Sequence, residues 1–110
     1  MATAYKVLGQ LNPSATTETT LYTAPSSTST VVSTLTICNQ TSSAATYRIA
    51  VRPSADGSTA AKHFIIYGAT VAASDTTALT LGITLAAGDK IQVYASSANL
   101  SFSAFGSEIA

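Results

Sequence analysis

Residues 30–52 read TVVSTLTICNQTSSAATYRIAVR, and apolar and small polar residues alternate along two runs that a short polar loop joins. Successive side chains of a β-strand point to opposite faces, so a period of two indicates strands with one face against a core. In the second run, Tyr47, Ile49 and Val51 share one face, and the other face carries Arg48, Ala50 and Arg52. The stretch therefore predicts two half-buried strands.

The same pattern recurs on both sides of this stretch, and no segment shows a sustained apolar period of 3.6 residues. Turn-forming Pro, Gly, Asn and Asp residues separate the runs. The segment YGATVAASDTTAL is compatible with a helical turn or with a crossover between two sheets. We expect an all-β chain, a single jelly-roll-like β-sandwich of about eight short antiparallel strands, near residues 5–11, 20–24, 30–38, 46–52, 62–68, 77–81, 90–96 and 100–105.

The length of 110 residues corresponds to one domain, so residues 1–110 are expected to form a single β-sandwich. No run of about 18 apolar residues is present, and we expect no membrane partner. The start MATAYKVLGQ lacks the basic-then-apolar order of a secretory signal, so a soluble protein that is not exported is expected.

Charged residues make up only 9% of the chain, against about 25% in an ordinary soluble domain, and the formal net charge is zero. The five basic residues are scattered rather than clustered, which argues against nucleic acid as a partner. Ser and Thr together account for 33 of the 110 residues. Sheets usually protect their exposed surfaces with charge, so this composition indicates a surface that other subunits cover. A compositional bias of the source genome would give the same pattern.

The residues needed for catalysis or metal binding are sparse. His63 is the single histidine, so a His-rich metal site is not possible, and its place at a strand start favours a structural role. A triad would combine it with a serine and with Asp56, Asp75 or Asp89, but no Gly-x-Ser-x-Gly pattern is present. We expect no enzyme activity, no metal and no cofactor. The lone Cys38 fits a small buried residue.

Arg48 and Arg52 lie four residues apart on one strand, on the same face and roughly 13 Å from each other by strand rise. With Lys62 on the returning strand, they form a modest basic row. The row either solvates a sheet edge or pairs with carboxylates of a neighbouring subunit, where the planar guanidinium favours bidentate contact.

Several ordered motifs together resemble a known group of proteins. KVLGQLNPSATTETTLYTAP, VSTLTICN, YRIAVRP, GITLAAGDKIQVYAS and FSAFGSEIA are similar, over essentially the whole chain, to the small β-sandwich accessory virion proteins of tailed bacteriophages. The resemblance implies a structural protein of the virion without a catalytic site, assembled in the cytoplasm of the bacterial host. It also implies a homo-oligomer, most often a homotrimer, whose other partners are the major capsid protein or further virion proteins.

The short chain lacks a fibre shaft, which favours a capsid decoration (cement) protein that stabilises the head lattice. The terminal segments 1–25 and 100–110 are the candidate docking segments, with Phe102, Phe105 and Ile109 as apolar anchors. In the alternative, these three residues belong to the core of the domain itself. A second hypothesis is a tail, collar or fibre component, such as a receptor- or glycan-binding tip domain whose tyrosines stack on sugar rings; these are Tyr5, Tyr22, Tyr47, Tyr67 and Tyr94.

Overall fold

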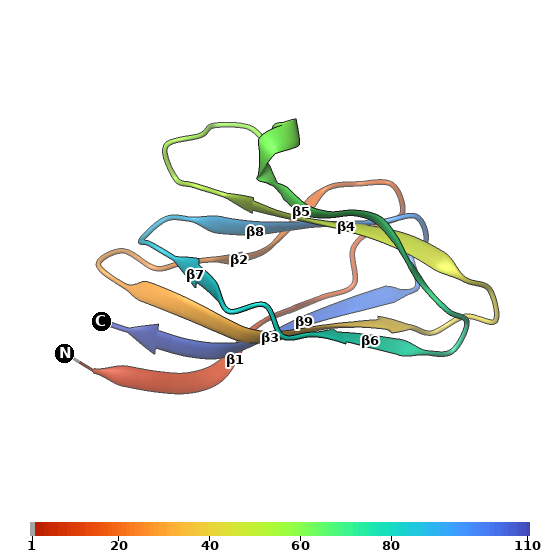
Figure 1. Ribbon diagram of the computed structural model, residues 1–110, viewed down its shortest axis with the longest axis horizontal. Helices are drawn as coiled ribbons and strands as arrows, with labels where there is room; N and C mark the ends of the chain where they lie inside the picture. Colours follow the sequence, from red (N-terminus) through yellow and green to blue (C-terminus); the bar gives the residue numbers. More distant parts are fainter. Residues whose placement is uncertain (1) are drawn as a thin grey trace.

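A computed structural model describes residues 2–110, which form two antiparallel sheets packed face to face (Figure 1). The elements are β1 (Thr3–Leu11), β2 (Thr19–Thr23), β3 (Ser29–Asn39), β4 (Ala45–Arg52), the 3₁₀ turn η1 (Ala61–His63), β5 (Phe64–Val71), β6 (Thr76–Leu79), β7 (Ile83–Leu85), β8 (Lys90–Ala95) and β9 (Leu100–Ile109). The all-β sandwich that the alternation predicts is confirmed.

The chain is a long antiparallel ribbon rolled into a sandwich. Its pairs are β4–β5 at the closed end, then β3 with β6 and β7, then β2–β8, and finally β1–β9. Rolling adds β3–β9 to one sheet and β4–β8 to the other. The sheets therefore have the orders β1-β9-β3-β6, with β7 also on β3, and β2-β8-β4-β5, which is the double Greek-key arrangement of a jelly roll.

The core lies between the two sheets and consists of the inward residues of each strand. Phe102 on β9 and Tyr47 on β4 meet edge to face across the layers, with ring centroids 6.3 Å apart. Ile49, Ile91 and Leu35 pack beside them, each at most 1% exposed. Burial on this scale contributes about 1.5–3 kcal/mol per large apolar side chain, so the inward positions hold the two layers together.

The structure differs from the sequence-based strand assignment at one sheet edge and at the ends of several strands. Residues 77–81 were expected as one strand, but the edge that pairs with β3 is split into β6 and β7, and Gly82 (φ +63°) lies between them. The segment VAASD was compatible with a helical turn or with a crossover. The structure shows the crossover, because the segment joins β5 in one sheet to β6 in the other. The last strand also extends beyond 105 to Ile109.

β9 is flanked on both sides by a β-bulge. The register shifts between Val7 and Gly9 on β1, and between Val32 and Thr34 on β3. Gly106 on β9 lies beside the bulge of β3, opposite Val32. A Cβ atom at Gly106 would fall 2.0 Å from the carbonyl oxygen of Val31. Only glycine permits that close approach of backbones.

Candidate interaction surfaces

The first candidate surface is the free edge of the β1-β9-β3 sheet. β1 forms this edge, beside the adjacent chain termini in Figure 1, and its outer-face side chains Tyr5 and Val7 are 85% and 50% exposed. Half-buried Phe105 lies opposite Val7 on β9, and half-buried Ile109 lies opposite Thr3. A shallow hollow of about 310 Å³ adjoins Tyr5 and Phe105 on the same face. The edge thus combines apolar side chains with open main-chain groups.

A polar cluster joins this edge to the other sheet. Lys6 Nζ lies 2.6 Å from one carboxylate oxygen of Glu108, and the hydroxyl of Tyr22 donates to the other. The Tyr22 oxygen also lies 2.9 Å from the hydroxyl of buried Thr30. Burial, with Glu108 as the next cause, raises the pKa of Tyr22 to about 12. The hydrogen bonds from Lys6 and then Tyr22 hold the pKa of Glu108 below its ordinary value.

The second candidate surface is the outer face of the β2-β8-β4-β5 sheet, where Arg48 lies between two tyrosine rings. Arg48 on β4 is paired with Tyr94 on β8 and with Tyr67 on β5, so the three side chains form a row across the sheet. The guanidinium carbon is 4.2 Å from the centroid of each ring. Both contacts are cation–π geometries, and the Tyr67 side chain remains 64% exposed.

Phe64 extends this row, with its ring centroid 5.0 Å from that of Tyr67 in an edge-to-face contact. The two rings line a depression of about 550 Å³ together with Thr59, Ala60 and Ala61 of the preceding loop. This depression and the Arg48 row make one continuous aromatic surface, which we call the tyrosine–arginine face.

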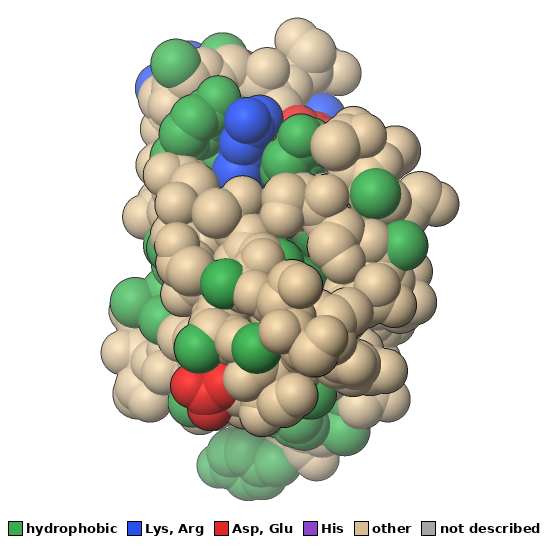
Figure 2. Space-filling model, turned by 90° about the vertical axis from the view of Figure 1, so that its right-hand side faces the viewer, with side chains coloured by type: hydrophobic (Ala, Val, Ile, Leu, Met, Phe, Trp, Pro, Cys, Tyr) green, Lys and Arg blue, Asp and Glu red, His purple; other side chains and the backbone are tan. Residues whose placement is uncertain are grey.

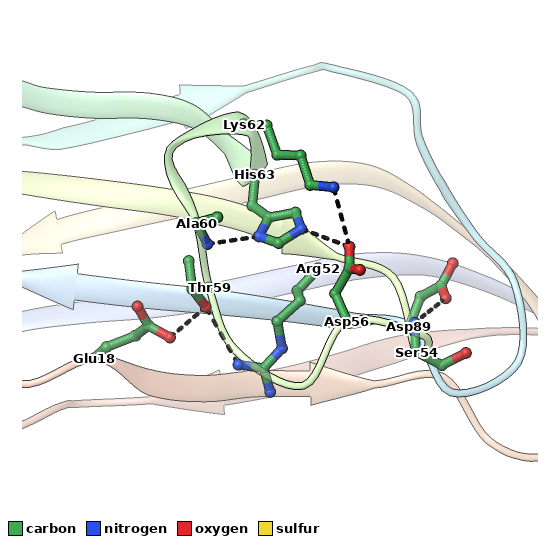
Figure 3. A network of polar contacts seen from close by, with 9 residues as sticks. All are labelled: Glu18, Arg52, Ser54, Asp56, Thr59, Ala60, Lys62, His63 and Asp89. Atoms are coloured by element: carbon green, nitrogen blue, oxygen red, sulfur yellow. Dashed lines mark hydrogen bonds and ion pairs between the residues drawn. The ribbon is translucent and has the colours of Figure 1, made fainter.

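The loop 53–63 folds over the same sheet and is held by polar contacts (Figure 3). Nδ1 of buried His63 accepts a hydrogen bond from the Ala60 N–H at 2.8 Å, and Nε2 donates to Asp56 at 2.8 Å. The hydrogen bond from His63, more than the charge of nearby Lys62, lowers the pKa of Asp56. Because both ring nitrogens are engaged in this arrangement, neither is positioned to accept a proton from a serine.

A second set of contacts ties the N-terminal half to this loop. Glu18 accepts hydrogen bonds from Thr59 at 2.7 Å and from Gln92 at 2.8 Å. Thr59 in turn accepts from Arg52 at 3.3 Å. Gln92 points outward on β8 but is buried, at 7% exposure, because this cluster covers it. These contacts hold the middle of the loop at Thr59, in addition to the contacts that His63 makes with Asp56 and Ala60.

The carboxylates of the chain are engaged internally. Asp56 and Glu108 have the ion pairs described above, Glu18 binds Thr59 and Gln92, Asp75 accepts from the Thr76 N–H, and Asp89 accepts from the N–H groups of Ser54 and Ala86. Because only 9% of the residues are charged, the face seen in Figure 2 carries few basic and acidic side chains. Within residues 2–110, no three His, Cys, Asp or Glu side chains gather as a metal site would require.

The structure distributes the predicted interface residues over both sheets. Arg48 and Arg52 share one face as expected, whereas Lys62 lies on η1 and is 3.8 Å from Asp56. Phe102 is fully buried against Tyr47, so its assignment as a docking anchor is wrong for the folded domain. The reason is the alternation along β9, which places positions 102 and 104 inward and Phe105 outward.

The two predicted docking segments also differ in availability. β9 is central and pairs with β1 on one side and β3 on the other, so the C-terminal strand has no free edge to offer a partner. β1, in the N-terminal segment, has one. The sequence offered no signal for this difference, because the order of strands in the sheet depends on contacts between distant segments.

The five tyrosines do not form a single platform. Tyr22 and Tyr47 are buried, at 8% and 2% exposure, so the prediction that they stack on sugars is wrong. Tyr5 belongs to one sheet, and Tyr67 and Tyr94 belong to the other. Asn39 is likewise buried, and its side-chain amide donates to the carbonyls of Ser43, Val71 and Ala72.

Comparison with known proteins gives no match: no family model fits the sequence, and neither a curated protein nor a solved structure shows significant similarity to the chain. The part of the chain that the structure describes has no helix with the length and apolar character needed to cross a bilayer.

Proposed function

We propose that this chain is a structural protein of a tailed-bacteriophage virion, a homo-oligomeric decoration protein that binds the major capsid protein and stabilises the head. The observation that carries the proposal is the combination of an open, apolar sheet edge at β1 with an exterior that is poor in charge. A monomer with such an edge is prone to association, so these features suit a protein whose surface is covered in its working state.

The contacts of Arg48 and Arg52 support a division of roles between the two surfaces. Arg48 contacts aromatic rings, and Arg52 contacts a hydroxyl, while each carboxylate described above is already occupied within the chain. Among the described residues, no ion pair joins either arginine to a carboxylate. Their partner is an acidic group on a different protein, such as a capsid subunit, where bidentate contact with a guanidinium is favourable.

Small domains can stabilise a capsid because they bind in many copies. Each copy bridges neighbouring subunits through modest contacts, and the linked contacts act at high effective concentration. Binding to the assembled lattice, and not to its dissociated subunits, then shifts the equilibrium toward the intact head. A compact domain measuring 45 × 28 × 20 Å has the dimensions for such a bridge.

The test separates purified virions into heads and tails and quantifies the chain in each fraction by mass spectrometry. We expect it in heads at many copies, and we expect heads stripped of it to release DNA at a lower temperature until the purified protein is added back. The double variant Arg48→Ala, Arg52→Ala should fold normally and bind stripped heads at least tenfold more weakly. Recovery only in tails, or in no virion fraction, would overturn the decoration role.

A second candidate function is a receptor- or glycan-binding module of a tail or fibre, and the tyrosine–arginine face favours it. Exposed aromatic rings beside a depression are suited to stacking on pyranose rings, with a guanidinium available for hydroxyl or carboxylate groups. On an array of bacterial surface glycans, Tyr67→Ala should abolish binding, and Tyr5→Ala on the opposite sheet should retain it. Absence of binding by the native protein would remove this candidate.

A further inference from the structure

The four sheet edges differ in how well they are protected. β2 has five residues and a register shift, β5 has two register shifts and Gly68 at φ +80°, and β6 and β7 are short and separated by Gly82. β1 alone presents five consecutive residues in unbroken register, Thr3 to Val7. Irregular and short edges resist pairing with another chain, so β1 is the edge best suited to accept a strand.

The register identifies which main-chain groups of β1 are open. Ala2 and Ala110 exchange both hydrogen bonds, at 3.3 and 2.8 Å. Hydrogen-bonded and non-hydrogen-bonded pairs alternate along an antiparallel ladder, so Ala4 and Lys6 also face β9. The N–H and C=O groups of Thr3, Tyr5 and Val7 therefore point away from the sheet.

We propose that two copies of the chain pair through β1 about a two-fold axis, with Tyr5 opposite Tyr5 of the second copy. Thr3 of each copy then lies opposite Val7 of the other, and the three open residues on each side form six intermolecular hydrogen bonds. No other antiparallel register pairs all three open positions, because a shift by two residues leaves one of them without an open partner. The β1-β9-β3-β6 sheets of the two copies then join, through β1, into one continuous sheet.

The side chains on both faces are compatible with this register. On the outer face, Val7 lies opposite Thr3 of the second copy. Phe105 is the β9 neighbour of Val7, and Ile109 is the β9 neighbour of Thr3, so these two predicted anchors lie on either side of the paired β1 strands. On the inner face, Ala4 meets Lys6 of the second copy, and Ala4 is itself paired with Glu108. Each Lys6 thus lies two strands from the carboxylate of the other copy, and no like charges are directly opposed.

The strand does not carry the usual protection against such pairing. A lysine on an edge strand normally repels or solvates an approaching strand. Here Lys6 points to the inner face and is bound to Glu108, so its charge is neutralised on the side away from Tyr5. This inference goes beyond the proposed function and does not depend on it.

Two-fold pairing is isologous and closes at two copies, whereas the homotrimer that the phage resemblance implies requires a different contact. Sedimentation velocity of the full chain over a hundredfold concentration range should therefore show reversible dimers. Tyr5→Lys places two like charges opposite each other at the axis and should raise the dimer dissociation constant at least tenfold. Tyr67→Lys, an equally drastic change at an exposed tyrosine of the other sheet, should leave it unchanged.

A disulfide scan checks the register in a Cys38→Ser background. Opposed residues of a hydrogen-bonded pair have Cα atoms about 5.5 Å apart, within the range of a disulfide. Tyr5→Cys should therefore crosslink as a dimer under mild oxidation, and Val7→Cys, about 13 Å from its own counterpart by strand rise, should not. A monomer at all concentrations, a trimer, or a dimer that both Tyr5 variants leave unaffected would overturn the pairing; the head-and-tail experiment above would stand independently.

Discussion

Replacement of Glu108 by glutamine tests how much the cluster of Lys6, Glu108 and Tyr22, which joins the β1 edge to the opposite sheet, contributes to stability. The carboxylate accepts a hydrogen bond from the buried Tyr22 hydroxyl and pairs with Lys6, whose side chain is 48% exposed. A hydrogen bond to a charged group contributes about 1.5–3 kcal/mol and a neutral one about 0.5–1.5, so Glu108→Gln loses about 1 kcal/mol here. The half-exposed ion pair adds about 0.2–1 kcal/mol after solvent screening.

The expected loss of unfolding free energy at pH 7 is therefore about 1–2 kcal/mol. Urea denaturation measures it directly, and with a slope of about 2 kcal/mol per molar the midpoint should fall by about 0.5–1 M. The slope itself should not change, because the glutamine side chain has the same shape and leaves the buried surface intact. A double-mutant cycle with Tyr22→Phe should show coupling between the two positions.

The difference in unfolding free energy between the native protein and Glu108→Gln also depends on pH. The folded-state pKa of Glu108 lies below its ordinary value of 4.5, so its stabilising effect is present above that value and is lost as the pH falls through the folded-state pKa. The difference between native protein and Glu108→Gln should hence be constant near neutrality and shrink below about pH 4.5. Asp56 also has a lowered pKa, but both proteins retain it and its effect cancels.

An unchanged difference between pH 7 and pH 3 would refute this account of the cluster. So would a Glu108→Gln protein as stable as the native chain at pH 7, because the carboxylate would then contribute nothing beyond an amide.

Two further substitutions test the close backbone approach and the buried amide. Gly106→Ala should destabilise the fold by about 3 kcal/mol or more, because the new methyl group would lie 2.0 Å from the Val31 carbonyl oxygen, whereas Gly57→Ala, with nothing within 4 Å, should change stability by less than about 0.5 kcal/mol. Equal urea midpoints for the two alanine variants would contradict the predicted clash. Asn39→Ala should lower the free energy of thermal unfolding by about 2–4 kcal/mol, since it removes the donor to the carbonyls of Ser43, Val71 and Ala72. A loss below about 0.5 kcal/mol would show that water replaces the amide without penalty.

Much of the fold was predictable because the relevant signal is local. In β4, alternation placed Tyr47 and Ile49 inward and Arg48 outward, and the structure agrees. Turn-forming residues likewise marked the breaks between the strands. At the reversal before β8, Gly88 has φ +84° and Asp89 accepts hydrogen bonds from two N–H groups. Such features depend on a residue and its near neighbours along the chain.

The candidate surfaces were only partly predictable. Arg48 and Arg52 were correctly placed on one face, but the contact of Arg48 with Tyr67 and Tyr94 was missed because its partners come from strands 19 and 46 positions away. The period of two along β8 points Gln92 outward, but it gives no sign that the contact with Glu18 buries this side chain.

The sequence by itself determined that the chain forms strands, which residues of each strand face inward, and that its exterior carries few charges. Tertiary structure alone decided which strand became an edge: β9 is enclosed between β1 and β3, while β1 is left open. The physical reason is that alternation specifies one face of a strand but carries no information about its neighbour. That choice depends on how the rolled ribbon brings distant segments into register.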